Sequence, residues 1–168
     1  FPSGAAAWKF SEEKFMKQFE DILSEGKLRV SYGLTGNNRV GDFTYLSAIN
    51  LPVNPQGYTF GNTTISGAIP SNFGNENLTW ETTEQFNIGL DLGFLNDRIN
   101  LTADIYRKKT KDLLVYANIP LSLGYAQAYR NIGSVQNQGL ELTLGTTNID
   151  NRDFKWKSSF NITFNQNK

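Results

Sequence analysis

Strict alternation of apolar and polar residues is the strongest pattern along this chain. In the segment EQFNIGLDLGF (residues 84–94), every second residue is apolar: Phe86, Ile88, Leu90, Leu92 and Phe94. A period of two indicates a β-strand with one apolar face and one polar face. The apolar face points into a protein core in a soluble sandwich, and into lipid in an outer-membrane barrel. The function of the chain depends on which of these environments applies.

The same alternation recurs in other segments. The segment INLTADIY (99–106) is separated from the first strand by the short turn 95–98, which predicts a tight hairpin. Further strands are predicted at LRVSYGL (28–34), QGLELTLGT (138–146) and FKWKSSFNITF (154–164). Because these strands follow one another along the chain, the predicted fold class is all-β, an antiparallel up-and-down meander.

The N-terminal region predicts a short strand followed by a short helix. Alternating apolar residues place the strand within residues 1–10. Ser11 is a suitable N-cap and Gly26 a suitable stop for a helix. The apolar residues between them have helical spacing: Phe15, Phe19, Ile22 and Leu23. We therefore expect one short helix near residues 11–25.

The connections between the strands alternate in length. Links 35–82 and 107–137 are long and irregular, whereas links 95–98 and 148–153 are short. Outer-membrane barrels have short turns at one end of their strands and long loops at the other, although a sandwich can show the same pattern. Within the long links, we expect a short hairpin in the first and a short strand in DLLVYANIP (112–120) of the second.

Strand length and face composition also favour a membrane barrel. Residues 84–94 and 154–164 have the roughly 9–11 residues that a tilted strand needs to cross a bilayer. The polar faces hold more Asn, Gly, Thr, Ser and Gln than Lys and Glu, which suits a crowded, wet lumen. The residues predicted to face lipid are Phe86, Ile88, Leu90, Leu92, Phe94, Ile99, Leu101, Leu140, Leu142, Leu144, Phe160 and Ile162.

Composition excludes several function classes. The 168 residues carry 16 basic and 16 acidic side chains, so no net charge attracts nucleic acid. The absence of Cys and His removes disulfides, thiolate nucleophiles, imidazole metal ligands and a Ser-His-Asp triad. The closest carboxylate pairs are Glu12–Glu13, Glu81–Glu84 and Asp150–Asp153. Each pair is better explained as a helix cap or as loop solvation, so no catalytic residue, metal ligand or cofactor is predicted.

Several phrases together resemble a known family. They are FPSGAAAWKFSEEKF, KLRVSYGLTGNN, NLTWETTEQFNIGLDLGFLNDRINLTADIYRKKTKDLL and NIGSVQNQGLELTL. They resemble the late barrel strands of TonB-dependent outer-membrane transporters, most closely the SusC/RagA-type subfamily of Bacteroidota. The two most specific phrases are a leu-x-trp-glu segment and an asn-x-gly-ser-x-x-asn-x-gly segment. Their residues here are Leu78, Thr79, Trp80 and Glu81, and Asn131, Gly133, Ser134, Asn137 and Gly139.

The resemblance implies a plugged barrel of roughly 22 strands. It also implies a SusD-like surface lipoprotein as a lid, TonB as the energy-coupling partner, and uptake of oligosaccharides or peptides across the outer membrane. This chain has no plug domain, no TonB box and too few strands, and its two ends lack the features of natural termini. We therefore expect residues 1–168 to be a fragment of the C-terminal part of such a multi-pass barrel, with outer-membrane lipid around it and no enzymatic activity.

Aromatic residues in the two long links are the candidates for contact with a glycan or peptide substrate or with the lid, because aromatic rings stack on sugars and anchor protein contacts. These residues are Tyr45, Tyr58, Phe60, Phe73, Trp80, Tyr116, Tyr125 and Tyr129. Two alternatives stay open at this point. One is a secreted, soluble carbohydrate-binding β-sandwich. The other is a small eight-stranded outer-membrane barrel acting as an adhesin or anchor.

Overall fold

The computed structural model describes residues 1–39, 41–51 and 57–168, which form two compact units. The first, here called the sheet unit, contains Phe1–Gly36, Thr82–Thr110 and Val135–Lys168. The second, here called the loop unit, contains Asn37–Glu81 and Lys111–Ser134. Each of the two predicted long links therefore contributes most of its residues to the loop unit.

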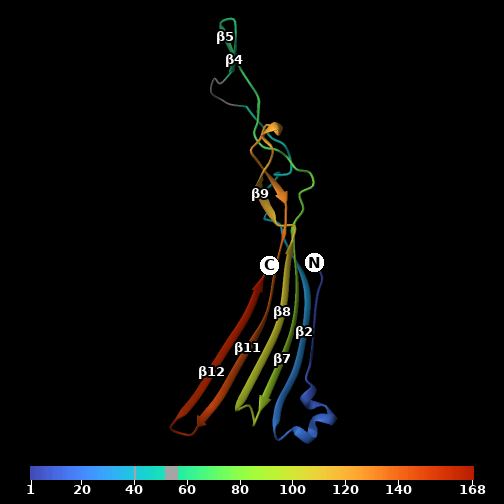
Figure 1. Cartoon of the computed structure of the whole chain (residues 1–168), viewed down its shortest axis with the longest axis vertical. Helices are drawn as coiled ribbons and strands as arrows, with labels where there is room; N and C mark the ends of the chain where they lie inside the picture. Colours follow the sequence, from blue (N-terminus) through green and yellow to red (C-terminus); the bar gives the residue numbers. More distant parts are fainter. Residues whose placement is uncertain (40, 52–56) are drawn as a thin grey trace. The chain divides into compact units, whose positions relative to one another are not determined.

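A six-stranded sheet makes up the sheet unit, with its strands in chain order (Figure 1). The strands are β1 (Ser3–Trp8), β2 (Leu23–Asn37), β7 (Glu81–Phe94), β8 (Ile99–Lys111), β11 (Ser134–Asp150) and β12 (Lys155–Asn167). The β1–β2 and β11–β12 pairs are antiparallel, and β1 and β12 lie at the two edges of the sheet. The predicted all-β antiparallel meander is therefore confirmed.

The strands extend beyond the segments that alternate. Strand β11, for example, has 17 residues, whereas alternation predicted 138–146. Its first residues break the alternation, since Gln136 and Gln138 share the face of Leu140, but backbone pairing continues there. Gln136 and Lys168 exchange two N–H···O hydrogen bonds of 2.9 Å each. Backbone hydrogen bonding, which alternation does not report, sets the ends of these strands.

The N-terminal helix prediction needs correction. Residues 11–25 do not form one helix, because two short 3-10 helices, η1 (Phe10–Glu12) and η2 (Lys14–Phe19), are followed by β2 from Leu23. Gly26 is a buried strand residue and not a helix stop. A Cβ atom at Gly26 would lie 2.5 Å from Cε2 of Phe10, so the ring of Phe10 occupies the space that a side chain would need. Ser11 does not cap η1.

The predicted hairpin at 95–98 is confirmed, and its turn has an unusual backbone. Leu95, Asn96 and Asp97 have φ values of 55°, 55° and 61°. Asn and Asp tolerate this left-handed region better than other non-glycine residues, which is why an Asn-Asp pair suits the turn. Ser24 Oγ donates to Asp97 Oδ1 at 2.7 Å, so β2 also holds the turn in place.

The apolar face of the sheet is not covered by a second layer within the sheet unit. None of the twelve residues predicted to face lipid is buried, and Phe160 is 62% exposed. The register places Leu142 opposite Ile162 and Leu144 opposite Phe160, so these side chains share one face. A soluble sandwich would bury this face against a second sheet, and the sheet unit contains one sheet alone.

The loop unit contains three small two-stranded sheets. β3 (Ile49–Asn50) pairs with β6 (Ile69–Pro70), β4 (Gly57–Phe60) pairs with β5 (Thr63–Ser66), and β9 (Leu114–Asn118) pairs with β10 (Gln127–Asn131). One further 3-10 helix, η3, spans Leu121–Leu123. The predicted hairpin in the first link and strand β9 in the second are confirmed. Strand β10 was not predicted, because QAYRN lacks an apolar alternation. No helix in the described ranges is long and apolar enough to cross a membrane.

Candidate functional site

All the aromatic residues proposed from sequence as substrate or lid contacts belong to the loop unit. Two ring pairs form there. Phe73 and Tyr125 meet edge to face with ring centroids 5.7 Å apart, and Tyr116 and Tyr129 lie 4.8 Å apart as partners in the β9–β10 register. The Phe73–Tyr125 pair joins the two long links. The structure therefore brings together regions that are far apart in sequence.

The other candidate aromatics are distributed through the same unit. Tyr45 and Trp80 are 45% and 55% exposed. Tyr58 and Phe60 lie in strand β4, and their side chains are outside the described part of the structure. Exposed rings offer stacking surface for a sugar or a peptide, and contact of these residues with substrate or lid stays a prediction.

A pocket of about 470 Å³ lies within the loop unit, inside the range of ligand sites. Both long links line it. The lining residues are Phe73, Asn75, Asn77, Ile119, Pro120, Leu123, Ala128, Tyr129, Arg130 and Asn131. Phe73 and Tyr129 belong to the set of aromatics predicted from sequence, whereas the asparagines and Arg130 were missed. Ala128, 3% exposed, is the buried apolar residue of this lining.

Asn131, one of the residues that line the pocket, joins the two links by hydrogen bonds. Its side-chain oxygen accepts a hydrogen bond from the Thr79 N–H at 2.9 Å, and its amide nitrogen donates to the carbonyl oxygens of Thr79 and Asp112, each at 2.8 Å. Nearby, Asn75 Nδ2 donates to the Tyr129 carbonyl oxygen at 3.1 Å. The two connections thus form one hydrogen-bonded body in which side-chain amides replace a regular sheet ladder.

Glu81 makes a second tie within the loop unit. Its carboxylate accepts hydrogen bonds from the Leu114 N–H at 2.9 Å and from Asn37 Nδ2 at 2.8 Å. Glu81 is the first of the 14 residues of β7. Because a tilted strand needs only roughly 9–11 residues to cross a bilayer, Glu81 lies outside the membrane-spanning part of this strand. These two donors, the backbone N–H first, hold the pKa of the Glu81 carboxyl below its ordinary value.

Three residues of the second family phrase have specific structural roles. Gly133 has a φ of +87°, a conformation that favours glycine, and it directly precedes β11. Asn137 Oδ1 accepts from Asn167 Nδ2 at 2.7 Å across β11 and β12. A Cβ atom at Gly139 would lie 2.7 Å from the hydroxyl of Tyr106, which therefore lies over this glycine.

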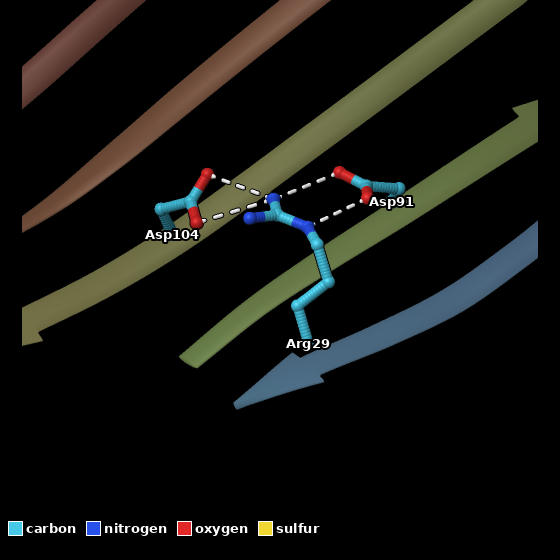
Figure 2. Close-up of polar contacts among 3 residues, drawn as sticks. All are labelled: Arg29, Asp91 and Asp104. Carbon is cyan, nitrogen blue, oxygen red and sulfur yellow. Dashed lines mark hydrogen bonds and ion pairs between the residues drawn. The ribbon is translucent and has the colours of Figure 1, made fainter. Parts of the chain in front are cut away.

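A charged cluster lies on the polar face of the sheet unit (Figure 2). Arg29 of β2 donates from Nε to Asp91 Oδ2 at 2.7 Å and from Nη2 to Asp91 Oδ1 at 3.0 Å. The same Nη2 atom lies 3.2 Å from both carboxylate oxygens of Asp104 on β8. One guanidinium therefore links three neighbouring strands. The three side chains are 34%, 23% and 20% exposed, so solvent screens them only in part.

Gly89 makes room for this cluster. A Cβ atom at Gly89 would lie 2.6 Å from Cζ of Arg29 and 2.5 Å from Oδ1 of Asp104. Sequence reasoning placed Arg29, Gly89 and Asp91 on polar faces but did not pair them. Opposite charges at polar positions of strands that are neighbours in a meander were the available signal.

No group of three or more His, Cys, Asp or Glu residues within ranges 1–39, 41–51 and 57–168 could hold a metal ion. The side-chain amides of Asn75 and Asn131 at the loop-unit pocket bond to neighbouring protein groups, and the carboxylates of the sheet-unit cluster pair with Arg29. The chemistry available here is binding by hydrogen bonds, aromatic stacking and one guanidinium.

A single amphipathic sheet whose long links form a separate body, while its other turns are short, defines an outer-membrane β-barrel wall with its loops. Comparison with known proteins agrees. The model of the family described as "TonB dependent receptor-like, beta-barrel" matches residues 1–168, so the chain belongs to this family of outer-membrane proteins. The resemblance found in the sequence is confirmed.

Relatives include the TonB-dependent receptor SusC of Bacteroides thetaiotaomicron, 44% identical, and TonB-dependent receptor P39 of Formosa agariphila, 40% identical. Both match 100% of this chain, which spans 17% and 15% of their lengths. Among solved structures, the RagAB peptide importer in its "open-open" state matches 98% of the chain with a TM-score of 0.82 at 30% identity. The chain covers 17% of that structure's chain.

Proposed function

We propose that these residues form a stretch of barrel wall, with two of its loops, in an outer-membrane active transporter that imports oligosaccharides or peptides. The observation that carries this proposal is the agreement in fold with the RagAB peptide importer over 98% of the chain, at a TM-score of 0.82. The 44% identity to SusC supports the same class of transporter. Strands of the remaining barrel pair with the free edges of β1 and β12, because unpaired edges cannot be left in a bilayer.

The apolar face of the sheet is the lipid-facing surface in this proposal. The twelve residues predicted from alternation fill that role, and the polar face with Arg29, Asp91 and Asp104 lines the lumen. A charged cluster requires water or protein around it, because a charge within hydrocarbon is costly. This assignment agrees with the pairing of Leu142 with Ile162 on the apolar side.

The loop unit serves as a contact surface for substrate or for a lid protein. Its pocket and its exposed rings support binding, and the hydrogen bonds of Asn131 and Glu81 keep the two loops together. We propose a SusD-like surface lipoprotein as the lid and TonB as the energy source, TonB acting through parts of the transporter outside these residues. The chain itself performs no enzymatic reaction and needs no cofactor in this account.

Uptake measurements test the proposal. Cells that carry the full-length protein are given a labelled oligosaccharide mixture and a labelled peptide mixture, alongside cells that lack the gene and cells that lack TonB. We expect uptake of at least one mixture to require both the gene and TonB. Uptake of both mixtures that is unchanged by either deletion would contradict the transporter assignment.

A further inference from the structure

The loop-unit pocket has a distinctive distribution of chemical groups. Phe73, Ile119, Pro120 and Leu123 give it an apolar wall, and Arg130 of β10 is the one charged side chain among the described lining residues. No Asp or Glu from the described part of the chain lines it. Glu76, which lies between two lining asparagines in sequence, is exposed and outside the lining set.

The side-chain amides of Asn75 and Asn131 are already engaged, whereas the side-chain amide of Asn77 forms no hydrogen bond within the described residues. Asn75 Oδ1 accepts from the Asn77 N–H at 3.1 Å, while Asn75 Nδ2 donates to the Tyr129 carbonyl oxygen. The Asn131 side chain accepts a hydrogen bond from Thr79 through its oxygen and donates to the carbonyl oxygens of Thr79 and Asp112 through its nitrogen. The amides of Asn75 and Asn131 hold the wall and have little capacity left for a ligand.

The Arg130 side chain forms no hydrogen bond or ion pair within the described residues. The position is held firmly, because β10 pairs with β9 from Gln127 to Asn131 and places Arg130 opposite Val115. A guanidinium offers five N–H donors in a planar fork that matches a carboxylate bidentately. An uncommitted arginine beside an apolar wall therefore suits a ligand with a carboxylate and a less polar body.

We propose that this pocket binds the carboxylate of the imported substrate through Arg130, with the body of the ligand against Phe73, Ile119, Pro120 and Leu123. The inference rests on the proposed transport function and deepens it by naming an acidic substrate class. The carboxylate has two possible sources, a uronic acid in an oligosaccharide or the terminal carboxylate of a peptide. Both present the same planar anion to the arginine.

Binding to the purified full-length protein in detergent tests the inference with two matched pairs of probes. The first pair is an oligogalacturonate and its methyl ester, and the second is an apolar tripeptide and its C-terminal amide. We expect the carboxylate member of one pair to bind at least about 10-fold more tightly than its neutral partner, as a charge-assisted hydrogen bond provides. The pair that responds identifies the source of the carboxylate.

Variants at Arg130 connect that preference to this pocket. Arg130→Gln is expected to remove the preference, while Arg130→Lys keeps the charge without the fork and retains part of it. Arg152→Gln, which removes an exposed arginine from the turn between β11 and β12, is the matched control and should change nothing. Heat-modifiable mobility on a gel checks that each barrel remains folded.

Two results would overturn the inference. One is equal binding of the carboxylate and neutral members of both pairs, and the other is a carboxylate preference that survives in Arg130→Gln. Failure of all four probes to bind would overturn it as well. In each case the transporter assignment is judged separately by gene- and TonB-dependent uptake, so the two proposals can fail independently.

Discussion

Asn131 and Thr79, 52 residues apart in sequence, form a two-way hydrogen-bonded pair. The Asn131 side chain accepts from the Thr79 N–H at 2.9 Å and donates to the Thr79 carbonyl oxygen at 2.8 Å. A side-chain amide thus imitates the two hydrogen bonds that a neighbouring strand would provide. Thr79 and Asn131 belong to the two phrases typical of the family, so this pair joins those two phrases in space.

Asn131→Ala should loosen the loop unit without unfolding the sheet. It removes three hydrogen bonds, which together contribute about 1–3 kcal/mol at a half-buried site. We expect faster hydrogen exchange at the amides of residues 78–81 and 112–114 in the full-length protein. Asn118→Ala, which removes one exposed contact with Gln127, is the control and should leave exchange in these segments unchanged. Equal effects of the two variants would contradict this role of Asn131.

Arg29→Gln should destabilise the barrel wall more than the loss of an exposed ion pair does. It leaves the carboxylates of Asp91 and Asp104 facing each other at a partly buried site, at a cost of about 1–3 kcal/mol. Lys155→Gln breaks the exposed pair with Asp150 and should cost less than Arg29→Gln, because solvent screens this pair. Urea unfolding of the full-length protein in micelles measures both. Adding Asp91→Asn to Arg29→Gln should recover part of the loss.

Gly89→Ala should resemble Arg29→Gln. The new Cβ atom would displace the guanidinium from Asp104, and we expect a cost of about 1–3 kcal/mol. Gly145→Ala is the matched control, since the nearest atoms to its Cβ lie 3.9 Å away, in ordinary contact. If the Gly89→Ala and Gly145→Ala variants have the same unfolding midpoint, the position of the Arg29 guanidinium does not depend on the space above Gly89.

Alternation predicted the sheet well for a physical reason. A strand with one apolar and one polar face has the same period in lipid as in a soluble sheet, so the strands and the turn 95–98 were found. Alternation carries no information where apolar and polar residues do not follow one another regularly, and this is why the ends of β11 and the whole of β10 were missed. The helical spacing of Phe15, Phe19 and Ile22 predicted one helix over a segment that forms short 3-10 helices and then enters β2 at Leu23.

The sites were less accessible to sequence reasoning than the strands. The Arg29 cluster depends on which residues of β2, β7 and β8 lie side by side, and alternation does not determine that register. The connection between the two long links depends on side-chain amides that bond to irregular backbone, such as Asn131 with the carbonyl oxygen of Asp112. Family phrases indicated that these residues matter, and only the structure indicates what they contact.

Acidification should loosen the loop unit through Glu81. The folded-state pKa of this carboxyl is below its unfolded value, so its stabilising contribution is complete above the unfolded pKa and is lost as the pH falls through the folded pKa. We expect wild-type protein to become more sensitive to an acid-active protease in this unit as the pH falls below about 4. Glu81→Gln removes this ionisation, so its sensitivity should vary less with pH. The same pH response in both proteins would exclude Glu81 as the cause.

Lipid contact of the apolar face is the central claim, and spin labels at two register pairs test it most directly. These 168 residues contain no cysteine, so single cysteines at Leu142, Ile162, Thr143 and Asn161 can carry labels in a full-length protein without other cysteines, in liposomes. Collision rates with oxygen, which concentrates in lipid, and with a water-soluble nickel chelate are measured at each site. We predict oxygen contact at Leu142 and Ile162 and nickel contact at Thr143 and Asn161. Nickel contact at all four sites, or exclusion of both reagents from Leu142 and Ile162, would contradict the account.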